Sequence, residues 1–402
     1  MQKIIAMQLT NRQLFLQNLA IPAIVPDALE IVYAEGIYLY ELSGDRYIDL
    51  VSGVSVSNVG HRHPKVIKAI EDQLGKYMHL MVYGKYIQSP QVQLAGALAA
   101  NLPESLQSVF LVNSGSEAIE GALKLAKRAT GRTELIAFKN AYHGSTHGAL
   151  SVLGNEEMKS AFRPLLPDVK FCTFNDPNML PEITERTACV IVEPIQAEAG
   201  IVIPDTEWIN ALRHRCSNTG TLLIFDEVQM GFGRTGKLMA FEHFGIVPDI
   251  LCLAKGMGGG MPIGAFVASR QLMNLLTHHP ALGHITTFGG HPVCAAAALA
   301  SLQVILDENL SLSAQLKGKQ FVNLLEKHPL VAQIRQIGLM LAVELIPGYS
   351  VDKLVKIFQK NRLIVDQFLF NSTAFRIAPP LTITNSEVVE SAKLVIQSLN
   401  EL

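Results

Sequence analysis

Two charged residues stand directly after short apolar runs, where they could do chemistry together. Asp226 follows TLLIF (221–225), and Lys255 lies between LCLA (251–254) and GMGGGMPIG. A carboxylate is expensive to bury alone, so Asp226 is either in a structural salt bridge or a permanent anion that holds a cationic ring nitrogen. A buried lysine has a lowered pKa and becomes a nucleophilic amine. The apolar flanks argue against a solvated surface position for Lys255.

The stretch NSGSEA (113–118) joins an apolar run to a helical pattern. Backbone N–H groups at a helix N-terminus are unpaired, and the helix dipole favours an anion there. Gly115 allows close approach of the backbone, and Ser116 can both cap the helix and donate to a phosphate. Taken alone, the stretch is more typical of an ordinary helix cap with acidic Glu117 in its first turn.

Two further stretches carry histidines. In AYHG (141–144), Tyr142 could stack on a flat cofactor ring, although a single tyrosine is more often a packing residue. His143, taken alone, is more typical of a loop histidine that is satisfied by hydrogen bonds. His61 and His63 are two positions apart and have no acidic or cysteine partner at metal-ligand spacing. We therefore predict no metal site.

The stretch GFGRTG (231–236) matches the G-x-G-x-x-G pattern of dinucleotide-binding loops, which would indicate an NAD-dependent dehydrogenase. Such a loop should join strand to helix directly, with an acidic residue at the end of the next strand. Here residues 227–230 separate Asp226 from the first glycine, and Asp249 precedes its strand. The context disfavours the dehydrogenase, and the glycines are interpreted as a sharp turn beside the site.

The elements that must position these residues alternate between buried strands and helices. Ala118, Ile119, Ala122 and Ala126 recur at helical spacing, which predicts a helix over 116–131 that ends at Gly131. The predicted buried strands are 108–115, 133–138, 189–194, 221–226, 249–254 and 263–269. Short apolar runs separated by helices indicate an α/β fold with a mostly parallel sheet covered on both faces, and such sheets bind ligands at the carboxyl ends of their strands.

Three segments are expected along the chain. Residues 1–50, with strands at 36–41 and 46–50, form an N-terminal segment that packs with a small domain. Residues 51–293 form the large cofactor-binding domain, and residues 294–402 form the C-terminal small α/β domain. The elements predicted in the small domain are a helix over 294–308, a strand over 338–346, an amphipathic helix over 351–362 and an extended segment over 376–384.

Composition excludes several classes of function. The 402 residues are 49% hydrophobic and 17% charged, which suits a large α/β core or a subunit interface, and the net charge of −2 suggests no nucleic acid or membrane partner. The N-terminal residues lack a signal-peptide pattern, and the scattered cysteines read as buried thiols, so we expect a cytoplasmic protein. The cysteines are Cys172, Cys189, Cys216, Cys252 and Cys294.

Together these stretches closely resemble the class III (omega-amino acid) aminotransferases, and among them the acetylornithine and ornithine aminotransferases. The resemblance runs from about Tyr33 to the C-terminus. The stretches occur in the order NSGSEA, AYHG, EPIQAEAG (193–200), DEVQMGFGRTG (226–236), LAKGMGGGMPIGA (253–265), TTFGGHP (286–292) and FRIAPPL (375–381). The resemblance implies a transaminase with the type I fold of pyridoxal 5′-phosphate-dependent transferases.

The family's cofactor contacts carry over to matching positions. Lys255 matches the lysine that forms the Schiff base and moves the proton, and Asp226 matches the carboxylate that pairs with the ring nitrogen. Gln229 matches the residue near the ring hydroxyl. Tyr142 matches the aromatic that stacks on the ring, and His143 beside it is included among the cofactor-binding candidates.

The phosphate and the substrates have their own matching positions. Gly115 and Ser116 match the phosphate-binding turn, and Thr287 matches a threonine that reaches the phosphate of the neighbouring subunit, which implies a homodimer with shared active sites. Arg376 matches the arginine that grips the carboxylate of glutamate or 2-oxoglutarate. Glu198 matches the glutamate that neutralises this arginine when an omega-amine donor is bound.

Two departures from the family pattern affect the prediction. Ser145 replaces an arginine that helps hold the donor's carboxylate. Ornithine, acetylornithine or 4-aminobutyrate is therefore expected as the donor only if another arginine takes that role, and otherwise the donor is a diamine or another omega-amine. His291 replaces an asparagine, and we have no account of its role. An aminomutase or racemase with the same cofactor is disfavoured, because neither needs the second dicarboxylate substrate that Arg376 and Glu198 suggest.

Overall fold

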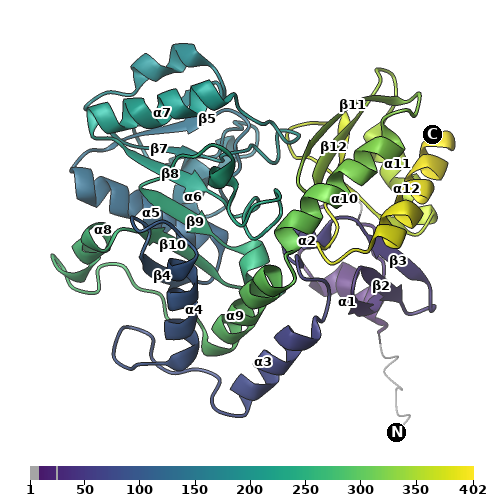
Figure 1. The fold of residues 1–402 in the computed structure, drawn as a ribbon, viewed down its shortest axis with the longest axis horizontal. Helices are drawn as coiled ribbons and strands as arrows, with labels where there is room; N and C mark the ends of the chain where they lie inside the picture. The colour runs from purple at the N-terminus through teal and green to yellow at the C-terminus, as the bar shows by residue number, and fades with distance from the viewer. Residues whose placement is uncertain (1–8, 24–25) are drawn as a thin grey trace, which may run out of the picture.

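The computed structural model describes residues 9–23 and 26–402. The chain forms two lobes, and the large lobe is built on a seven-stranded sheet (Figure 1). Its strands lie in the order β4 (Ser108–Val112), β10 (Gly264–Ala268), β9 (Ile250–Leu253), β8 (Leu222–Asp226), β7 (Thr187–Val192), β5 (Glu134–Phe138) and β6 (Val169–Cys172). Strands from β9 to β6 pair in parallel, whereas β10 is antiparallel to both of its neighbours. The predicted mostly parallel sheet is therefore confirmed.

Each strand of this sheet contributes to two separate cores, because successive side chains point to opposite faces. In β5, Leu135 and Ala137 face the core covered by α5 (Gly115–Thr130), whereas Ile136 and Phe138 face the core that contains Trp208 of α7 (Thr206–Thr219). All four strand side chains are fully buried. Burial on both faces explains why the strands read as continuous apolar runs in the sequence.

The small lobe combines chain segments from both ends of the sequence. One antiparallel sheet has the order β11 (Val331–Ile337), β12 (Met340–Leu345), β15 (Ala374–Ile377) and β14 (Asp366–Gln367). A second sheet has the order β1 (Ile31–Glu35), β2 (Tyr38–Glu41), β3 (Arg46–Asp49) and β13 (Leu363–Ile364). Because β3 pairs in parallel with β13, the N-terminal strands lie against the C-terminal segment, as Figure 1 shows.

Helices connect and cover the sheets. α9 (Pro292–Asp307), which the predicted boundary at 293 assigns to the small domain, packs against α3 (Pro64–Leu74) and α4 (Ser89–Ala100). The division into three segments stays a prediction. The other α-helices are α1 (Asn11–Asn18), α2 (Ser52–Ser55), α6 (His147–Ser151), α8 (Arg270–Asn274), α10 (Leu310–Leu325), α11 (Val351–Lys360) and α12 (Asn385–Asn400).

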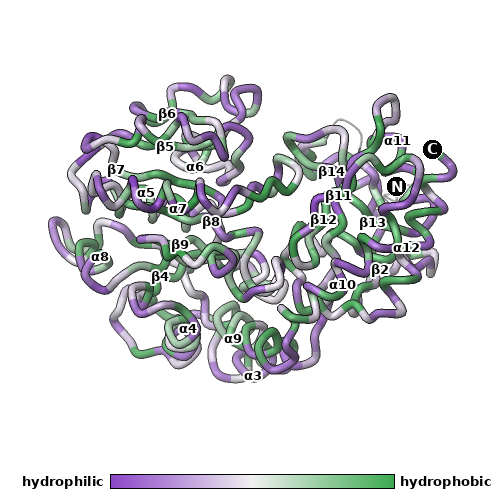
Figure 2. Tube along the Cα trace, turned by 45° about the horizontal axis from the view of Figure 1, so that its top comes forward, coloured by the Kyte–Doolittle hydropathy of each residue, from purple (hydrophilic) through white to green (hydrophobic). Residues whose placement is uncertain are grey.

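Apolar residues concentrate along the strands of both lobes, and hydrophilic residues lie on the outer loops (Figure 2). Within residues 9–23 and 26–402, no single helix is long and apolar enough to cross a membrane. In the same part of the chain, α9 and α10 together have the length and hydropathy of a membrane span, and they are bent by 66° where they meet.

Candidate active site

A cavity of about 450 Å³ lies at the carboxyl ends of the large sheet. Strands β4, β5, β7, β8 and β9 all run in one direction, so the residues that follow them meet at this edge. The predicted site residues that line the cavity are Gly115, Ser116, Tyr142, His143, Glu198, Asp226, Gln229 and Lys255. The structure therefore brings together side chains that are up to 140 positions apart in the sequence (115 to 255).

The turn after β4 presents the N-terminus of α5 to the cavity. Ser114, not Ser116 as expected, is the N-cap, and its hydroxyl accepts a hydrogen bond from the Glu117 N–H at 3.2 Å. The hydroxyl of Ser116 is thus not used for capping. Gly115 has to lack a side chain, because a Cβ there would lie 2.8 Å from a methyl group of Val228. N–H groups in the first helical turn have no intrahelical acceptor, so this end of the cavity suits an anion.

Asp226 is held at the end of β8 by a buried histidine. Its carboxylate lies 2.7 Å from Nδ1 of His143 and accepts the Val228 N–H at 3.0 Å. Both Asp226 and His143 are buried. His143 therefore orients the carboxylate that faces the cavity, and His143 Nε2 has no hydrogen-bond partner within the described residues.

Glu193 is a buried carboxyl in the cavity wall that the sequence analysis did not single out. It accepts the backbone N–H of Tyr142 at 3.1 Å and that of Ala197 at 3.0 Å. Burial raises the pKa of Glu193 to about 7, and the negative charge of Asp226 adds to this effect while His143 opposes it. Glu193 thus anchors the loop that carries Tyr142. The signal was its position at the end of the apolar run CVIV (189–192).

Lys255 follows β9 in an unusual backbone conformation. Its φ of 47° lies in the left-handed region, which a residue with a Cβ seldom adopts outside functional or tightly constrained sites. Burial lowers the pKa of Lys255, and Arg376 lowers it further, while the carboxylates of Glu198, Asp226 and Glu193 oppose the shift. Within the described residues, its amine makes no hydrogen bond or ion pair. Lys255 therefore lines the cavity with an amine whose pKa is lowered by burial.

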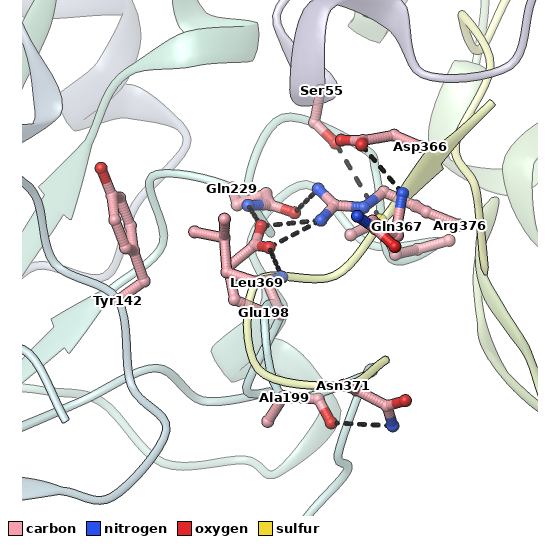
Figure 3. A network of polar contacts seen from close by, with 12 residues as sticks. Ser55, Tyr142, Glu198, Ala199, Gln229, Asp366, Gln367, Leu369, Asn371 and Arg376 are labelled. Carbon is pink, nitrogen blue, oxygen red and sulfur yellow. Dashed lines mark hydrogen bonds and ion pairs between the residues drawn. The ribbon is translucent and has the colours of Figure 1, made fainter. Parts of the chain in front are cut away.

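Arg376, Glu198 and Gln229 form a buried polar network behind the cavity (Figure 3). The guanidinium of Arg376 donates to both carboxylate oxygens of Glu198, at 2.9 and 2.7 Å, and to the Gln229 carbonyl at 3.0 Å. The amide NH2 of Gln229 donates to Glu198 at 3.0 Å. Burial would raise the pKa of Glu198, but Arg376 and these hydrogen bonds hold it below its ordinary value. Glu198 therefore neutralises Arg376 as an ionised carboxylate.

Ser145, Thr287 and His291 lie in three different surroundings. The hydroxyl of Tyr142 lies 3.2 Å from that of Ser145. Thr287 does not line the cavity of its own chain; it is exposed, and its hydroxyl lies 3.1 Å from the hydroxyl of Tyr83. His291 precedes α9, and its ring stacks on that of His79 with the centroids 5.7 Å apart. This contact indicates a packing role for His291.

The glycines of GFGRTG form a turn and not the start of a helix. Gly233 and Gly236 have φ values of 86° and 93°, which favour glycine. Between them Arg234 is fully buried and donates to the carbonyls of Leu339 and Pro379 at 2.9 and 2.7 Å. The loop thereby ties the large lobe to the small lobe, and it has no dinucleotide-binding geometry.

Glu227, the neighbour of Asp226, is buried away from the cavity wall and has a structural role. It accepts the N–H groups of Ala240 and Phe241 at 2.5 and 2.7 Å. Burial raises the pKa of Glu227 to about 8, against the opposing effect of these two N–H groups. A carboxyl whose pKa is raised by folding stabilises the fold when it is protonated, and this contribution is lost as the pH rises toward the folded-state value.

We expect Glu227→Gln to weaken the pH dependence of stability. The wild-type free energy of unfolding should fall between about pH 5.5 and about pH 8.5, and the variant's should fall less, by a difference of roughly a few kcal/mol. Denaturant unfolding at the two pH values measures both. The variant should be less stable at the lower pH, because one N–H then faces an amide NH2. An unchanged pH slope in the variant would contradict this assignment.

Comparison with known proteins identifies the class of this fold and site. The family model for aminotransferase class-III matches residues 24–399. The chain therefore belongs to the class-III aminotransferases, and its fold is that of pyridoxal phosphate-dependent transferases of type I, as predicted. It is an enzyme, a transaminase that uses pyridoxal 5′-phosphate.

Individual relatives cover most of the chain. The [LysW]-aminoadipate semialdehyde/glutamate semialdehyde transaminase of Sulfolobus acidocaldarius is 38% identical and covers 92% of this chain and 95% of its own. An acetylornithine aminotransferase of Methanopyrus kandleri is 42% identical, over 78% of this chain and 80% of its own. A putrescine aminotransferase of Pectobacterium atrosepticum is 40% identical, over 90% of this chain and 81% of its own. Among solved structures, the ornithine aminotransferase of Toxoplasma gondii has a TM-score of 0.87 and 30% identity, and covers 97% of this chain and 92% of its own.

Proposed function

We propose that this transaminase moves an amino group from an omega-amine donor to 2-oxoglutarate and that Lys255 forms the Schiff base with the cofactor. The observation that carries the proposal is the placement of Lys255, Asp226 and the N-terminus of α5 around one cavity. These groups fit pyridoxal 5′-phosphate, whose aldehyde, ring nitrogen and phosphate need an amine, an anion and N–H donors. When bound, the cofactor serves as an electron sink for the substrate carbon.

Each of these residues has one part in the proposed reaction. Asp226, oriented by His143, keeps the ring nitrogen protonated. Gly115 and Ser116 hold the phosphate, and Tyr142 covers the ring from the loop that Glu193 anchors. Lys255 would hold the cofactor through its aldehyde, and the free amine of Lys255 would act as base and acid at the substrate carbon.

The Arg376–Glu198 pair supports two substrates in one site. A guanidinium can bind a carboxylate through two parallel hydrogen bonds, so Arg376 suits one carboxylate of 2-oxoglutarate. While an amine donor is bound, Glu198 keeps the buried guanidinium neutralised through its two contacts of 2.9 and 2.7 Å. Gln229, which the family resemblance places near the ring hydroxyl, is hydrogen-bonded to both Glu198 and Arg376.

Among omega-amine donors, the cavity favours a diamine. Within the described residues, its lining includes no arginine, and one lining carboxyl group, that of Glu193, is assigned neither to the cofactor nor to Arg376. Ser145, which replaces the expected arginine, offers only a hydroxyl group paired with Tyr142. Such a wall suits a donor that carries a second amine more than one that carries a carboxylate. A relative described as putrescine aminotransferase agrees with this choice.

We also propose a homodimer in which Thr287 reaches the phosphate site of the partner subunit. Thr287 is exposed in the single chain, and exposed apolar residues flank it. Ile285 and Phe288 are 48% and 55% exposed, and contact with a partner subunit would remove this apolar surface from water. The cytoplasmic location stays a prediction.

A panel of amine donors tests the proposed reaction. Purified enzyme is given 2-oxoglutarate with a diamine, ornithine, acetylornithine or alanine, and the glutamate formed is measured. We expect the diamine to be the best donor and alanine the poorest, by about tenfold or more in kcat/KM. Glutamate formation from alanine alone would overturn the omega-amine assignment. An amino group that changes position within the donor, with no glutamate formed, would indicate the aminomutase.

A further inference from the structure

The carboxylate of Glu198 is held by a third donor besides Arg376 and Gln229. The backbone N–H of Leu369 donates to Glu198 Oε2 at 3.1 Å (Figure 3). Glu198 is only 3% exposed, so its carboxylate is hydrogen-bonded by protein groups and not by bulk water. The set consists of one guanidinium, one side-chain amide and one backbone amide, and it forms a receptor for a single carboxylate.

The segment 368–371 is fixed in the position that places this N–H. The guanidinium of Arg376 lies over the ring of Phe368, with its carbon 4.7 Å from the ring centroid. The Phe370 N–H donates to the backbone carbonyl of Glu198 at 3.0 Å. Phe368 is buried, whereas Leu369 is 50% exposed. It is therefore the backbone of Leu369, and not its side chain, that contributes to the receptor.

We propose that the N–H of Leu369 binds the carboxylate of the dicarboxylate substrate together with Arg376, and that Glu198 fills this place while the substrate is absent. The proposal rests on the role of Arg376 in the proposed function. For 2-oxoglutarate to reach Arg376, Glu198 has to leave, and its departure removes the partner of the Leu369 N–H. A buried N–H without an acceptor is unfavourable, whereas a substrate carboxylate restores the bond.

The receptor would therefore discriminate by charge and by shape. A carboxylate has two acceptor oxygens, so one can face Arg376 while the other accepts from Leu369. A neutral group of the same size would leave one of these donors unpaired. Leu369 is thus a specificity-determining position whose effect is carried by its backbone, which the identity of its side chain does not reveal.

Binding of glutarate to the holoenzyme tests the proposal without turnover. Glutarate has two carboxylates and neither an amine nor a ketone, so it cannot react. Isothermal titration should show tighter binding to Glu198→Ala than to the wild type, because the internal carboxylate no longer competes. In the Glu198→Ala background, Leu369→Pro and Leu369→Ala both lose the leucine side chain, but only proline also loses the N–H. We expect the proline variant to bind glutarate about tenfold more weakly than the alanine variant.

Hydrogen exchange at the Leu369 amide gives a second readout if the proline variant does not fold. The amide should be protected in the wild type, exchange faster in Glu198→Ala, and regain protection when glutarate is added. Equal glutarate affinities of the folded proline and alanine variants, or exchange at Leu369 that glutarate leaves unchanged, would overturn the proposal.

A further variant separates this inference from the proposed function. Arg376→Gln in the Glu198→Ala background should abolish measurable glutarate binding. If glutarate binds as well without the guanidinium, or if Glu198→Ala binds none, the role of Arg376 is wrong and the proposed function fails with it. If binding depends on Arg376 but not on the Leu369 N–H, only the further inference fails.

Discussion

Replacing Lys255 with alanine should reduce amino transfer by at least about a thousandfold. General acid–base catalysis by a placed side chain contributes roughly 10²–10⁴-fold, and the lost covalent attachment adds to that effect. Lys255 makes no hydrogen bond within the described residues, so its removal should leave the fold intact. Initial rates with the best donor of the panel, and circular dichroism of the purified variant, measure the two expectations.

A lysine outside the site provides the control for this substitution. Lys237 is exposed on the loop after GFGRTG, and Lys237→Ala should keep wild-type rates. Transfer by Lys255→Ala within about tenfold of the wild-type rate would show that another group moves the proton.

Replacing Asp226 with asparagine should lower kcat/KM by roughly 10²–10³-fold and weaken retention of the cofactor. A neutral amide cannot hold the ring nitrogen in its protonated form, and removal of one partner of a buried charge pair costs about 3–5 kcal/mol. The amide oxygen of the new side chain can still accept the Val228 N–H, so the local backbone should persist. Kinetics with saturating pyridoxal phosphate separate slow chemistry from lost cofactor.

The matched control is a carboxylate outside the cavity. The side chain of Asp307 is 63% exposed in a surface ion pair with Lys65, so Asp307→Asn should behave as wild type. If Asp226→Asn showed the same kcat/KM as this control, Asp226 would be a structural residue and the ring nitrogen would need another partner.

Much of the fold and most of the cavity wall could be predicted from local sequence. The apolar runs before Asp226 and Lys255 predicted β8 and β9, because residues buried on both faces of a sheet leave a continuous signal. Parallel strands place their carboxyl ends at one edge, so residues that follow different strands could be expected to meet. Gly131 marked the end of α5, where it adopts a φ of 67°.

What could not be predicted depends on long-range contacts. The N–H of Leu369 meets Glu198 across 171 positions, and nothing local to either residue signals the contact. Arg234 is buried against Leu339 and Pro379, which lie 105 and 145 positions further along the chain. Ser116 was predicted to be able to cap the helix expected over 116–131, but the helix begins at Gly115 and its N-cap is Ser114. The role proposed for Thr287 depends on a second chain.

Reduction of the holoenzyme with borohydride tests the central claim most directly. Borohydride converts a Schiff base into a stable secondary amine, so the cofactor stays attached through proteolysis. Mass spectrometry of the peptides should find pyridoxal phosphate on the peptide that contains Lys255, and on no peptide of the reduced Lys255→Ala variant. Label on another lysine of the wild type, or no covalent label in a protein that contains the cofactor, would contradict the account.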